Sequence, residues 1–228
     1  MSNNTVLLLH NSSQSCCILI NSEAPLGALL SFRGLFSVEA ESPMCFEPAS
    51  TPRTTGCTED ETECYSYIDI SVLIGLLLSS GAIDFIVTGC SSGQGMMLAC
   101  NSIPGVICGY APTPKDAYLF AQINNGNAIS LPLGKEYTWG GFENFDKTIQ
   151  ALFSEPFGQG YPKSEAARKL KDSEKLKEIR KLGQVSISEL LNRLDPGLLD
   201  IIKKKQDEWT RGTGLLVQKS WNICKVDH

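Results

Sequence analysis

The fold is decided by residues 83–110, which read IDFIVTGCSSGQGMMLACNSIPGVICGY. Ile83–Thr88 is a short apolar run rich in branched residues, which predicts a buried strand. A glycine-rich turn follows, and Gly95–Asn101 is then predicted to be a helix. Val106–Gly109 predicts a second strand only a few residues later. Two strands joined by one helix through short connections are typical of a parallel sheet with a right-handed crossover.

The same alternation continues on both sides of this stretch. The further predicted elements are a helix over Ile68–Ser80, a helix from Pro114 to near Ile123, a strand over Ala128–Leu131 and a helix over Phe142–Phe153. Thr113 and Pro114 provide an N-cap and a first-turn proline for the second of these helices. We therefore predict an α/β protein with a mostly parallel sheet. In such sheets, ligands bind beyond the carboxyl ends of the strands.

The two ends of the chain are less regular. Thr5–Leu9 predicts one buried strand, whereas residues 15–66 show no sustained period and stay poorly defined. From Lys163 onwards the chain is charged and helical. We therefore expect an α/β domain over residues 1–160 and a helical extension over residues 161–228.

Composition excludes several classes of partner. The 228 residues contain 20 Lys and Arg against 25 Asp and Glu, a formal net charge of −5, which argues against a nucleic acid held by phosphate neutralisation. The longest apolar run, Ile68–Leu78, contains Asp69 and is far shorter than the roughly 20 residues that span a bilayer. Nine scattered cysteines, an odd number, fit free thiols better than a disulfide framework. We expect a cytoplasmic protein with no nucleic-acid or membrane partner.

The candidate site is the turn TGCSSGQGMM, over Thr88–Met97. A glycine-rich turn from strand to helix directs several backbone N–H groups, and the positive end of the helix dipole, at one point beyond the sheet. That point is suited to an anion. Cys90 lies at the start of the turn, where the same field favours the thiolate form of its side chain. A thiolate there serves as a nucleophile or as a base, and electrostatics alone do not distinguish the two.

Other kinds of site fit the sequence poorly. No Gly-Lys-Ser/Thr follows the turn, as a phosphate-binding P-loop requires. The next strand ends at Tyr110 without the acidic residue that would hold the ribose of NAD or FAD. The cysteines match no common zinc spacing, and the only histidines are His10 and His228. We expect no metal and no cofactor, and the shortage of histidine also argues against a Cys-His hydrolase.

A second polar cluster, Asn124-Asn125-Gly126-Asn127, joins a predicted helix to a predicted strand. Asparagine in such a turn commonly adopts the left-handed backbone conformation and bonds to nearby backbone. In a parallel sheet this loop lies at the edge opposite to the Cys90 turn, unless Asn124 reaches the site of a neighbouring subunit. Both interpretations stay open on the sequence.

These motifs together resemble the ribose-5-phosphate isomerase B and galactose-6-phosphate isomerase family, in particular its longer members with a helical C-terminal extension. The resemblance is carried by DFIVTGCSSGQGMM, NSIPGVICGY, DAYLFAQINNGNAISLP and GQGYP, and it extends from about Tyr67 to Pro162. It implies a Rossmann-like three-layer α/β sandwich and a homodimer or homotetramer with shared active sites. It also implies interconversion of aldose and ketose phosphates without a metal or a cofactor.

The resemblance further implies roles for single residues. Cys90 is the expected base, moving a proton between adjacent carbons through an enediolate. The backbone amides of residues 92–96 are the expected anion hole. Asn124 matches an asparagine that contacts the sugar from the partner subunit. The candidate substrate-binding residues are Ser91, Ser92, Gly93, Gln94, Gly95, Met96, Asn124, Asn11 and Lys135, with Arg168 as a second candidate, after Lys135, for the phosphate.

Three departures from the family pattern leave the function open. Ser91 stands where the family has glycine, and Asn11 lies in the stretch where a family Asp-His pair is missing. Ile123 stands where the family has the histidine that assists ring opening. An acyclic four-carbon phosphate needs no such acid, so pentose, hexose and tetrose phosphates are all candidate substrates. The alternatives are a catalytically impaired sugar-phosphate-binding protein and a thiol-dependent hydrolase or transferase with an adduct on Cys90.

Overall fold

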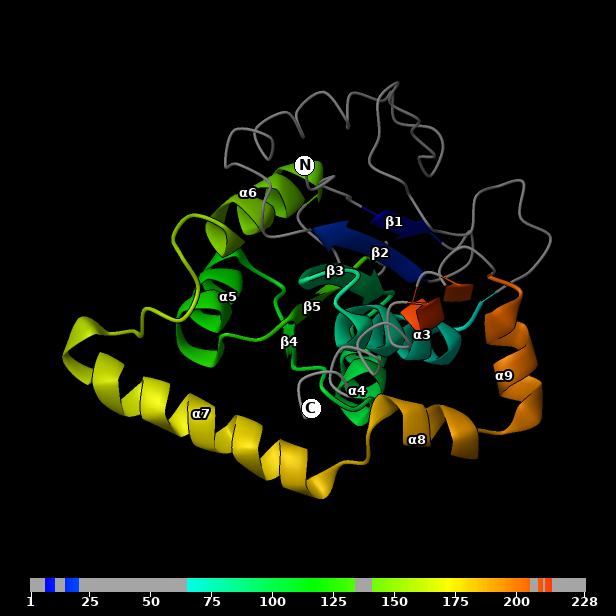
Figure 1. Ribbon diagram of the computed structural model, residues 1–228. Coiled ribbons are helices and arrows are strands. Elements are labelled where there is room, and N and C mark those ends of the chain that lie inside the picture. Colours follow the sequence, from blue (N-terminus) through cyan, green and yellow to red (C-terminus); the bar gives the residue numbers. More distant parts are fainter. Residues whose placement is uncertain are drawn as a thin grey trace, which may run out of the picture.

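A five-stranded sheet forms the centre of the protein. The structure is a computed structural model that describes residues 7–10, 15–20, 65–133, 141–205, 209–210 and 212–214. The strands are β1 (Leu7–His10), β2 (Ser15–Ile20), β3 (Phe85–Cys90), β4 (Cys108–Tyr110) and β5 (Ala128–Pro132), in the spatial order β1-β2-β3-β5-β4 (Figure 1). β3, β5 and β4 are parallel, as predicted, whereas β2 is antiparallel to both β1 and β3.

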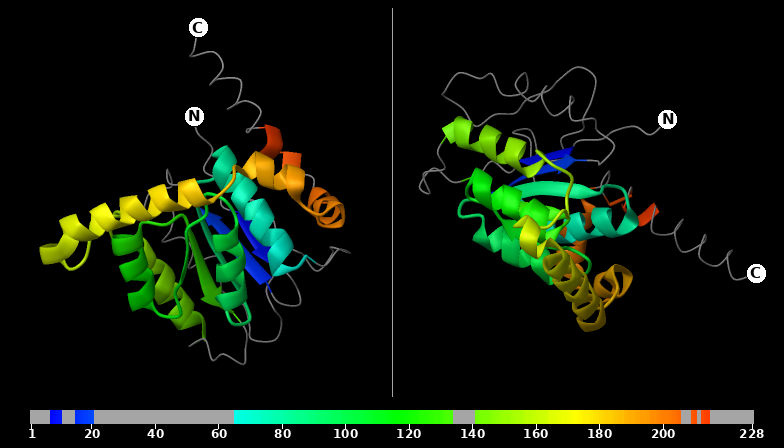
Figure 2. Two further views of the ribbon diagram at one scale, coloured as in Figure 1. Left: turned by 90° about the horizontal axis from the view of Figure 1, so that it is seen from below. Right: turned by 90° about the vertical axis from the view of Figure 1, so that its left-hand side faces the viewer.

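Helices cover both faces of the sheet, and this confirms the predicted Rossmann-like α/β class. They are α3 (Tyr67–Ser80), α4 (Gln94–Ser102), α5 (Pro114–Leu119), the π-helical η1 (Phe120–Asn124), α6 (Gly141–Leu152), the 3-10 turn η3 (Lys163–Glu165), α7 (Ala166–Gly183), α8 (Ile187–Arg193) and α9 (Pro196–Lys203). The α3–α4 layer and the α5–α6 layer lie on opposite sides of the strands (Figure 2).

The helix α3 is buried on nearly every side, because it lies between the sheet and the C-terminal helices. Its start is fixed by a capping box, in which the Ser66 hydroxyl accepts from the Asp69 amide (3.2 Å) and the Asp69 carboxylate accepts from the Ser66 amide (2.6 Å). Its end is fixed by Gly81, whose φ of 75° is the left-handed conformation that glycine adopts at least cost. Both ends of the helix are therefore determined by local sequence.

Two apolar clusters fill the spaces on the two faces of the sheet. Side chains of β3 alternate between them: Ile86 and Cys90 belong to the cluster with α3 and α4, and Phe85 and Val87 to the cluster with α5 and α6. This alternation follows from the two-residue period of a strand. The side chain of Cys90 therefore faces the α3–α4 layer.

The C-terminal helices pack on the same body. Ile187 of α8, Leu191 of α8 and Ile202 of α9 are buried in the cluster that contains α3. The division between residues 1–160 and 161–228 stays a prediction, since these helices share a core with α3. In the part of the chain that the structure describes, no helix combines the length and apolar character needed to cross a membrane.

Candidate functional site

Cys90 is the last residue of β3, at the carboxyl end of a strand with neighbours on both sides. In the sheet it is opposite Ser15 of β2 and Pro132 of β5. The Cys90 carbonyl accepts hydrogen bonds from the amides of Gly93 (3.1 Å) and Leu133 (2.9 Å). Its side chain is 8% exposed and the thiol is free. Cys90 thus lies where ligands bind in open α/β sheets, on backbone that is held from two directions.

The turn after Cys90 depends on Gly93, the N-cap residue of α4. Gly93 has a φ of 75°, and its carbonyl accepts hydrogen bonds from the Met97 amide (3.1 Å) and the buried Ser130 hydroxyl (2.6 Å). Ser130 belongs to β5, so the adjacent strand fixes the direction in which α4 leaves the turn. The start of α4 is therefore set by a contact across the sheet as well as by local sequence.

The backbone amides of this turn differ in what they donate to. The Gly93 amide donates a hydrogen bond to the Cys90 carbonyl, and the Gln94 amide donates to the Ser92 hydroxyl at 3.3 Å. The amides of Gly95 and Met96 lie in the first turn of α4, where an α-helix supplies no carbonyl acceptor. They carry the positive end of the helix dipole. Of residues 92–96, where an anion hole is expected, Gly95 and Met96 are thus the two whose amides lie in the first turn of α4 after Gln94, and Ser91 and Ser92 are partly exposed beside them.

The Cys90 sulfur lies against the first turn of α4, beside an aromatic ring. A Cβ built on Gly95 would lie 3.9 Å from Cys90 Sγ and 3.7 Å from the ring of Tyr67. Tyr67 is 41% exposed, so it borders the solvent side of this cluster. Tyr67 was not predicted from the sequence, because the first residue of a long apolar helix carries no pattern that points to a site.

The asparagine loop, Asn124–Asn127, lies just before β5, at the opposite end of the parallel strands from Cys90. The Asn127 side chain accepts from the Ile107 amide (2.8 Å) and donates to the Gly105 carbonyl (2.9 Å), both just before β4. Asn125 has a left-handed φ of 47°. Asn124 is exposed, and its carbonyl accepts from the Ser173 hydroxyl of α7 at 3.1 Å. Within one chain, Asn124 and Cys90 therefore lie at opposite ends of the parallel strands.

Of the remaining candidates, only Arg168 lies in the part of the chain that the structure describes, and its contacts are on its own helical segment. Arg168 pairs with Glu165 (2.7 Å) and Asp172 (3.0 Å) on its own helical segment, and the hydrogen bond to Glu165 is the main cause that raises the pKa of Arg168. Asn11 and Lys135 lie outside the described residues. Among the residues that are described, no three His, Cys, Asp or Glu side chains gather closely enough to hold a metal ion. The site brought together is thus Cys90, the turn after it, and Tyr67.

The contact from Ser130 to Gly93 gives a first prediction. We expect Ser130→Ala to lower kcat with a smaller change in KM, because the start of α4 and its amides lose one fixed contact. The free energy of unfolding should fall by about 1 kcal/mol, the usual net worth of one hydrogen bond. Steady-state kinetics and denaturant unfolding measure the two effects.

A serine in α4 is the control for Ser130→Ala. The Ser102 hydroxyl donates to the Leu98 carbonyl at 2.9 Å, at the exposed end of the same helix. Ser102→Ala removes the same atom and should leave kcat unchanged. Equal kcat in the wild type and in Ser130→Ala would show that this contact does not position the turn.

Comparison with known proteins identifies the family. The model of the family described as Ribose/Galactose Isomerase matches residues 50–169, which is 120 of the 228 residues. A crystal structure of a 4-deoxy-L-threo-5-hexosulose-uronate ketol-isomerase, complexed with a tartrate, is 39% identical with a TM-score of 0.62, over 67% of this chain and 72% of that one. The ribose-5-phosphate isomerase LacAB_rpiB from Vibrio parahaemolyticus is 36% identical with a TM-score of 0.63, over 68% and 75%.

A search among curated proteins found no match. The family model covers the Cys90 turn, the asparagine loop and the start of α7. The resemblance predicted from these motifs is thereby confirmed, and with it the enzyme class. By this match over more than half of its length, and by its likeness to both crystal structures, the chain belongs to the ribose/galactose isomerase family of aldose–ketose isomerases.

Proposed function

We propose that the protein interconverts an aldose and a ketose that carry an anionic group, with Cys90 as the base. The observation that supports this proposal is the position of the Cys90 sulfur, at the carboxyl end of β3 and against the first turn of α4. A base and a set of N–H donors are the two things that an enediolate reaction requires. The Cys90 thiol and such donors lie within one short turn, which supports the proposal.

The proposed steps move two protons of the substrate and need no other reactant. The Cys90 thiolate takes the proton from the hydroxyl-bearing carbon next to the aldehyde, and the electron pair moves onto the carbonyl oxygen to form an enediolate. The amides of Gly95 and Met96 stabilise the negative oxygen, and donors of this kind typically contribute several kcal/mol. The thiol then returns the proton to the carbon that was the aldehyde. The hydroxyl proton of the second oxygen passes to the first oxygen, which becomes a hydroxyl and leaves the second oxygen as the ketone.

The shared site is part of the proposal. Asn124 is exposed at the opposite end of the parallel strands from Cys90, and no contact within the described residues brings the two together. In a homodimer or homotetramer, Asn124 of one subunit can reach the Cys90 turn of the next. This arrangement follows the family resemblance, with the sugar held between Cys90 and an asparagine from the partner.

For the substrate we propose a sugar phosphate, with pentose, hexose and tetrose phosphates as candidates. The side chain of Ile123 carries no proton donor, so it cannot assist ring opening where the family has histidine. This favours a substrate that reacts in its open form. A four-carbon sugar phosphate is such a substrate, because the phosphate blocks the oxygen that would close a five-membered ring.

A second substrate class is favoured by one of the relatives. The crystal structure that is 39% identical is described as a ketol-isomerase of a hexosulose uronate, whose anionic group is a carboxylate. A carboxylate can occupy the donors of a helix N-terminus in the same way as a phosphate does. We therefore add open-chain sugar acids to the candidate substrates.

Proton exchange tests the proposed function. The protein is incubated in D₂O with ribose 5-phosphate, galactose 6-phosphate, erythrose 4-phosphate and 4-deoxy-L-threo-5-hexosulose uronate, and NMR follows deuterium incorporation next to the carbonyl. Exchange together with product formation for one of them supports the isomerase and identifies the substrate class. Binding of these compounds without exchange favours an impaired sugar-binding protein. A mass adduct on Cys90 after trapping favours a thiol hydrolase or transferase.

A further inference from the structure

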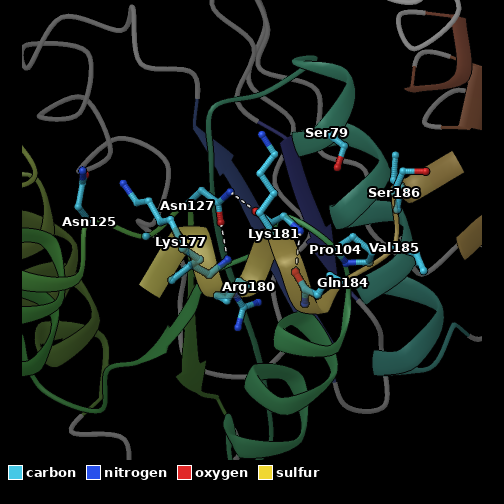
Figure 3. Close-up of a pocket in the computed structure, with 14 residues that line it drawn as sticks. Ser79, Pro104, Asn125, Asn127, Lys177, Arg180, Lys181, Gln184, Val185 and Ser186 are labelled. Carbon is cyan, nitrogen blue, oxygen red and sulfur yellow. Dashed lines mark hydrogen bonds between the residues drawn. The ribbon is translucent and has the colours of Figure 1, made fainter. Parts of the chain in front are cut away.

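A large pocket lies at the amino ends of the parallel strands β4 and β5, at the opposite end of the sheet from Cys90. It has a volume of about 810 Å³ and is bounded by the last turns of α7, the α4–β4 connection and the loop between η1 and β5 (Figure 3). This volume is typical of sites for small molecules. Neither Cys90, nor a residue of its turn, nor Asn124 lines the pocket, so the residues assigned to the proposed isomerase chemistry leave it without a role.

The lining of this pocket is basic. Lys177, Arg180 and Lys181 line it, together with Asn125, Asn127 and Gln184, and no Asp or Glu is among its lining residues. The whole chain carries a net charge of −5. Three cations without a lining carboxylate therefore create a local positive potential on an acidic protein.

The three cations are held differently. The Arg180 guanidinium donates to the carbonyls of Asn101 (3.2 Å) and Val106, so its charge is held in the wall of the pocket by groups that do not neutralise it. Lys177 pairs with Glu174 at 2.9 Å, and the Glu174 side chain is 65% exposed. An ion pair this exposed is worth little, so Lys177 can exchange Glu174 for a ligand. Lys181 is exposed.

The polar groups between these cations are already ordered. Asn127 is fixed by its two hydrogen bonds to the α4–β4 connection, and Gln184 Oε1 accepts from the Gly105 amide at 3.3 Å. Figure 3 shows Lys177 and Lys181 extending to the same side of α7, while Arg180 turns to the other. Two ammonium groups beside a wall of ordered polar groups suit a ligand with two or more negative charges.

We propose that this pocket binds a second small anion, a phosphorylated or polycarboxylate metabolite, through Lys177 and Lys181. The pocket is far larger than a single phosphate, and apolar side chains of the α4–β4 connection and of the segment after α7 complete its wall. The anion therefore carries an organic part that contacts these side chains. The site is separate from the Cys90 turn and does not depend on the reaction proposed there.

Calorimetric titration tests the proposal with pyrophosphate and with citrate, at constant ionic strength. The variant is Lys177→Gln/Lys181→Gln, in which both side chains keep nearly their length and lose their charge. We expect one or both probes to bind the wild type and to bind the variant at least tenfold more weakly. The probe that binds more tightly distinguishes a phosphate ligand from a carboxylate ligand.

The matched control removes the same charge from the same helix. Lys171 and Lys175 are exposed on α7 and do not line the pocket, so Lys171→Gln/Lys175→Gln should bind the probes as the wild type does. Equal binding by all three proteins would overturn the proposal, because the anion would then bind elsewhere, for instance at the Cys90 turn. Failure of both probes to bind the wild type, as when a second copy of the chain covers the pocket, would also overturn it.

Discussion

Cys90→Ala is expected to lower kcat/KM for the isomerisation by about 10²–10⁴-fold, the usual contribution of a positioned general base. The backbone amides of the turn stay in place in this variant, so binding of the anionic group should persist and KM should change less than kcat. Deuterium incorporation next to the substrate carbonyl should fall by the same factor as turnover, because both need proton removal. NMR exchange and steady-state kinetics on the same preparation measure the two rates.

A second buried cysteine provides a control that distinguishes loss of the catalytic base from loss of packing. Cys100 of α4 is a free thiol, fully buried in the same apolar cluster as Cys90. Cys100→Ala removes the same atom from that cluster and should leave kcat/KM unchanged. If the two variants lose activity equally, the loss comes from packing around α4, and Cys90 is not the base.

The part of the fold that was predictable from sequence is the part with a clear period and local end signals. Residues 67–153 alternate between helix and strand, and caps such as Thr113 before Pro114 mark where a helix begins. The strand Ser15–Ile20 was missed. Its sequence, SCCILI, is a short run without a polar–apolar period, and such runs do not distinguish strand from helix or loop.

In the candidate site, too, the residues that are adjacent in sequence were predicted, and those that reach the turn through tertiary contacts were not. Cys90 and the glycine-rich turn are adjacent in sequence, so a single stretch of chain predicted both. Ser130 contacts the turn from 37 residues away, through the pairing of β5 beside β3, and Tyr67 reaches it through the packing of α3 on α4. Those contacts depend on which strand neighbours which, and no local pattern carries that information.

Gly93→Ala is expected to lower the free energy of unfolding by about 2–4 kcal/mol and to reduce kcat strongly. The left-handed backbone of Gly93, with a φ of 75°, costs an alanine about 1 kcal/mol. The added Cβ would lie 2.7 Å from Tyr110 Cε2, and 2.8 Å and 2.9 Å from the carbonyl carbon and oxygen of Leu131. Overpacking of this kind typically costs 1–3 kcal/mol.

The neighbours of Gly93 cannot relieve this strain cheaply. Leu131 is paired with Gly89 of β3 and directly follows Ser130, which is paired with Tyr110 of β4, so its backbone cannot retreat without disturbing the sheet. The start of α4 must move instead, and with it the amides of Gly95 and Met96. Denaturant unfolding measures the first effect and steady-state kinetics the second.

Gly183→Ala is the control for this prediction. Gly183 is the last residue of α7, and among the described residues no heavy atom beyond its chain neighbours and its own helix backbone lies within 4 Å of the position of its Cβ. Alanine there should leave activity unchanged and stabilise the helix by at most about 1 kcal/mol. Because the two variants add the same methyl group, the difference between them isolates the conformation and the crowding of the turn. Wild-type stability and wild-type kcat in Gly93→Ala would mean that the turn tolerates a side chain, and that its amides do not need the left-handed residue in order to face the substrate.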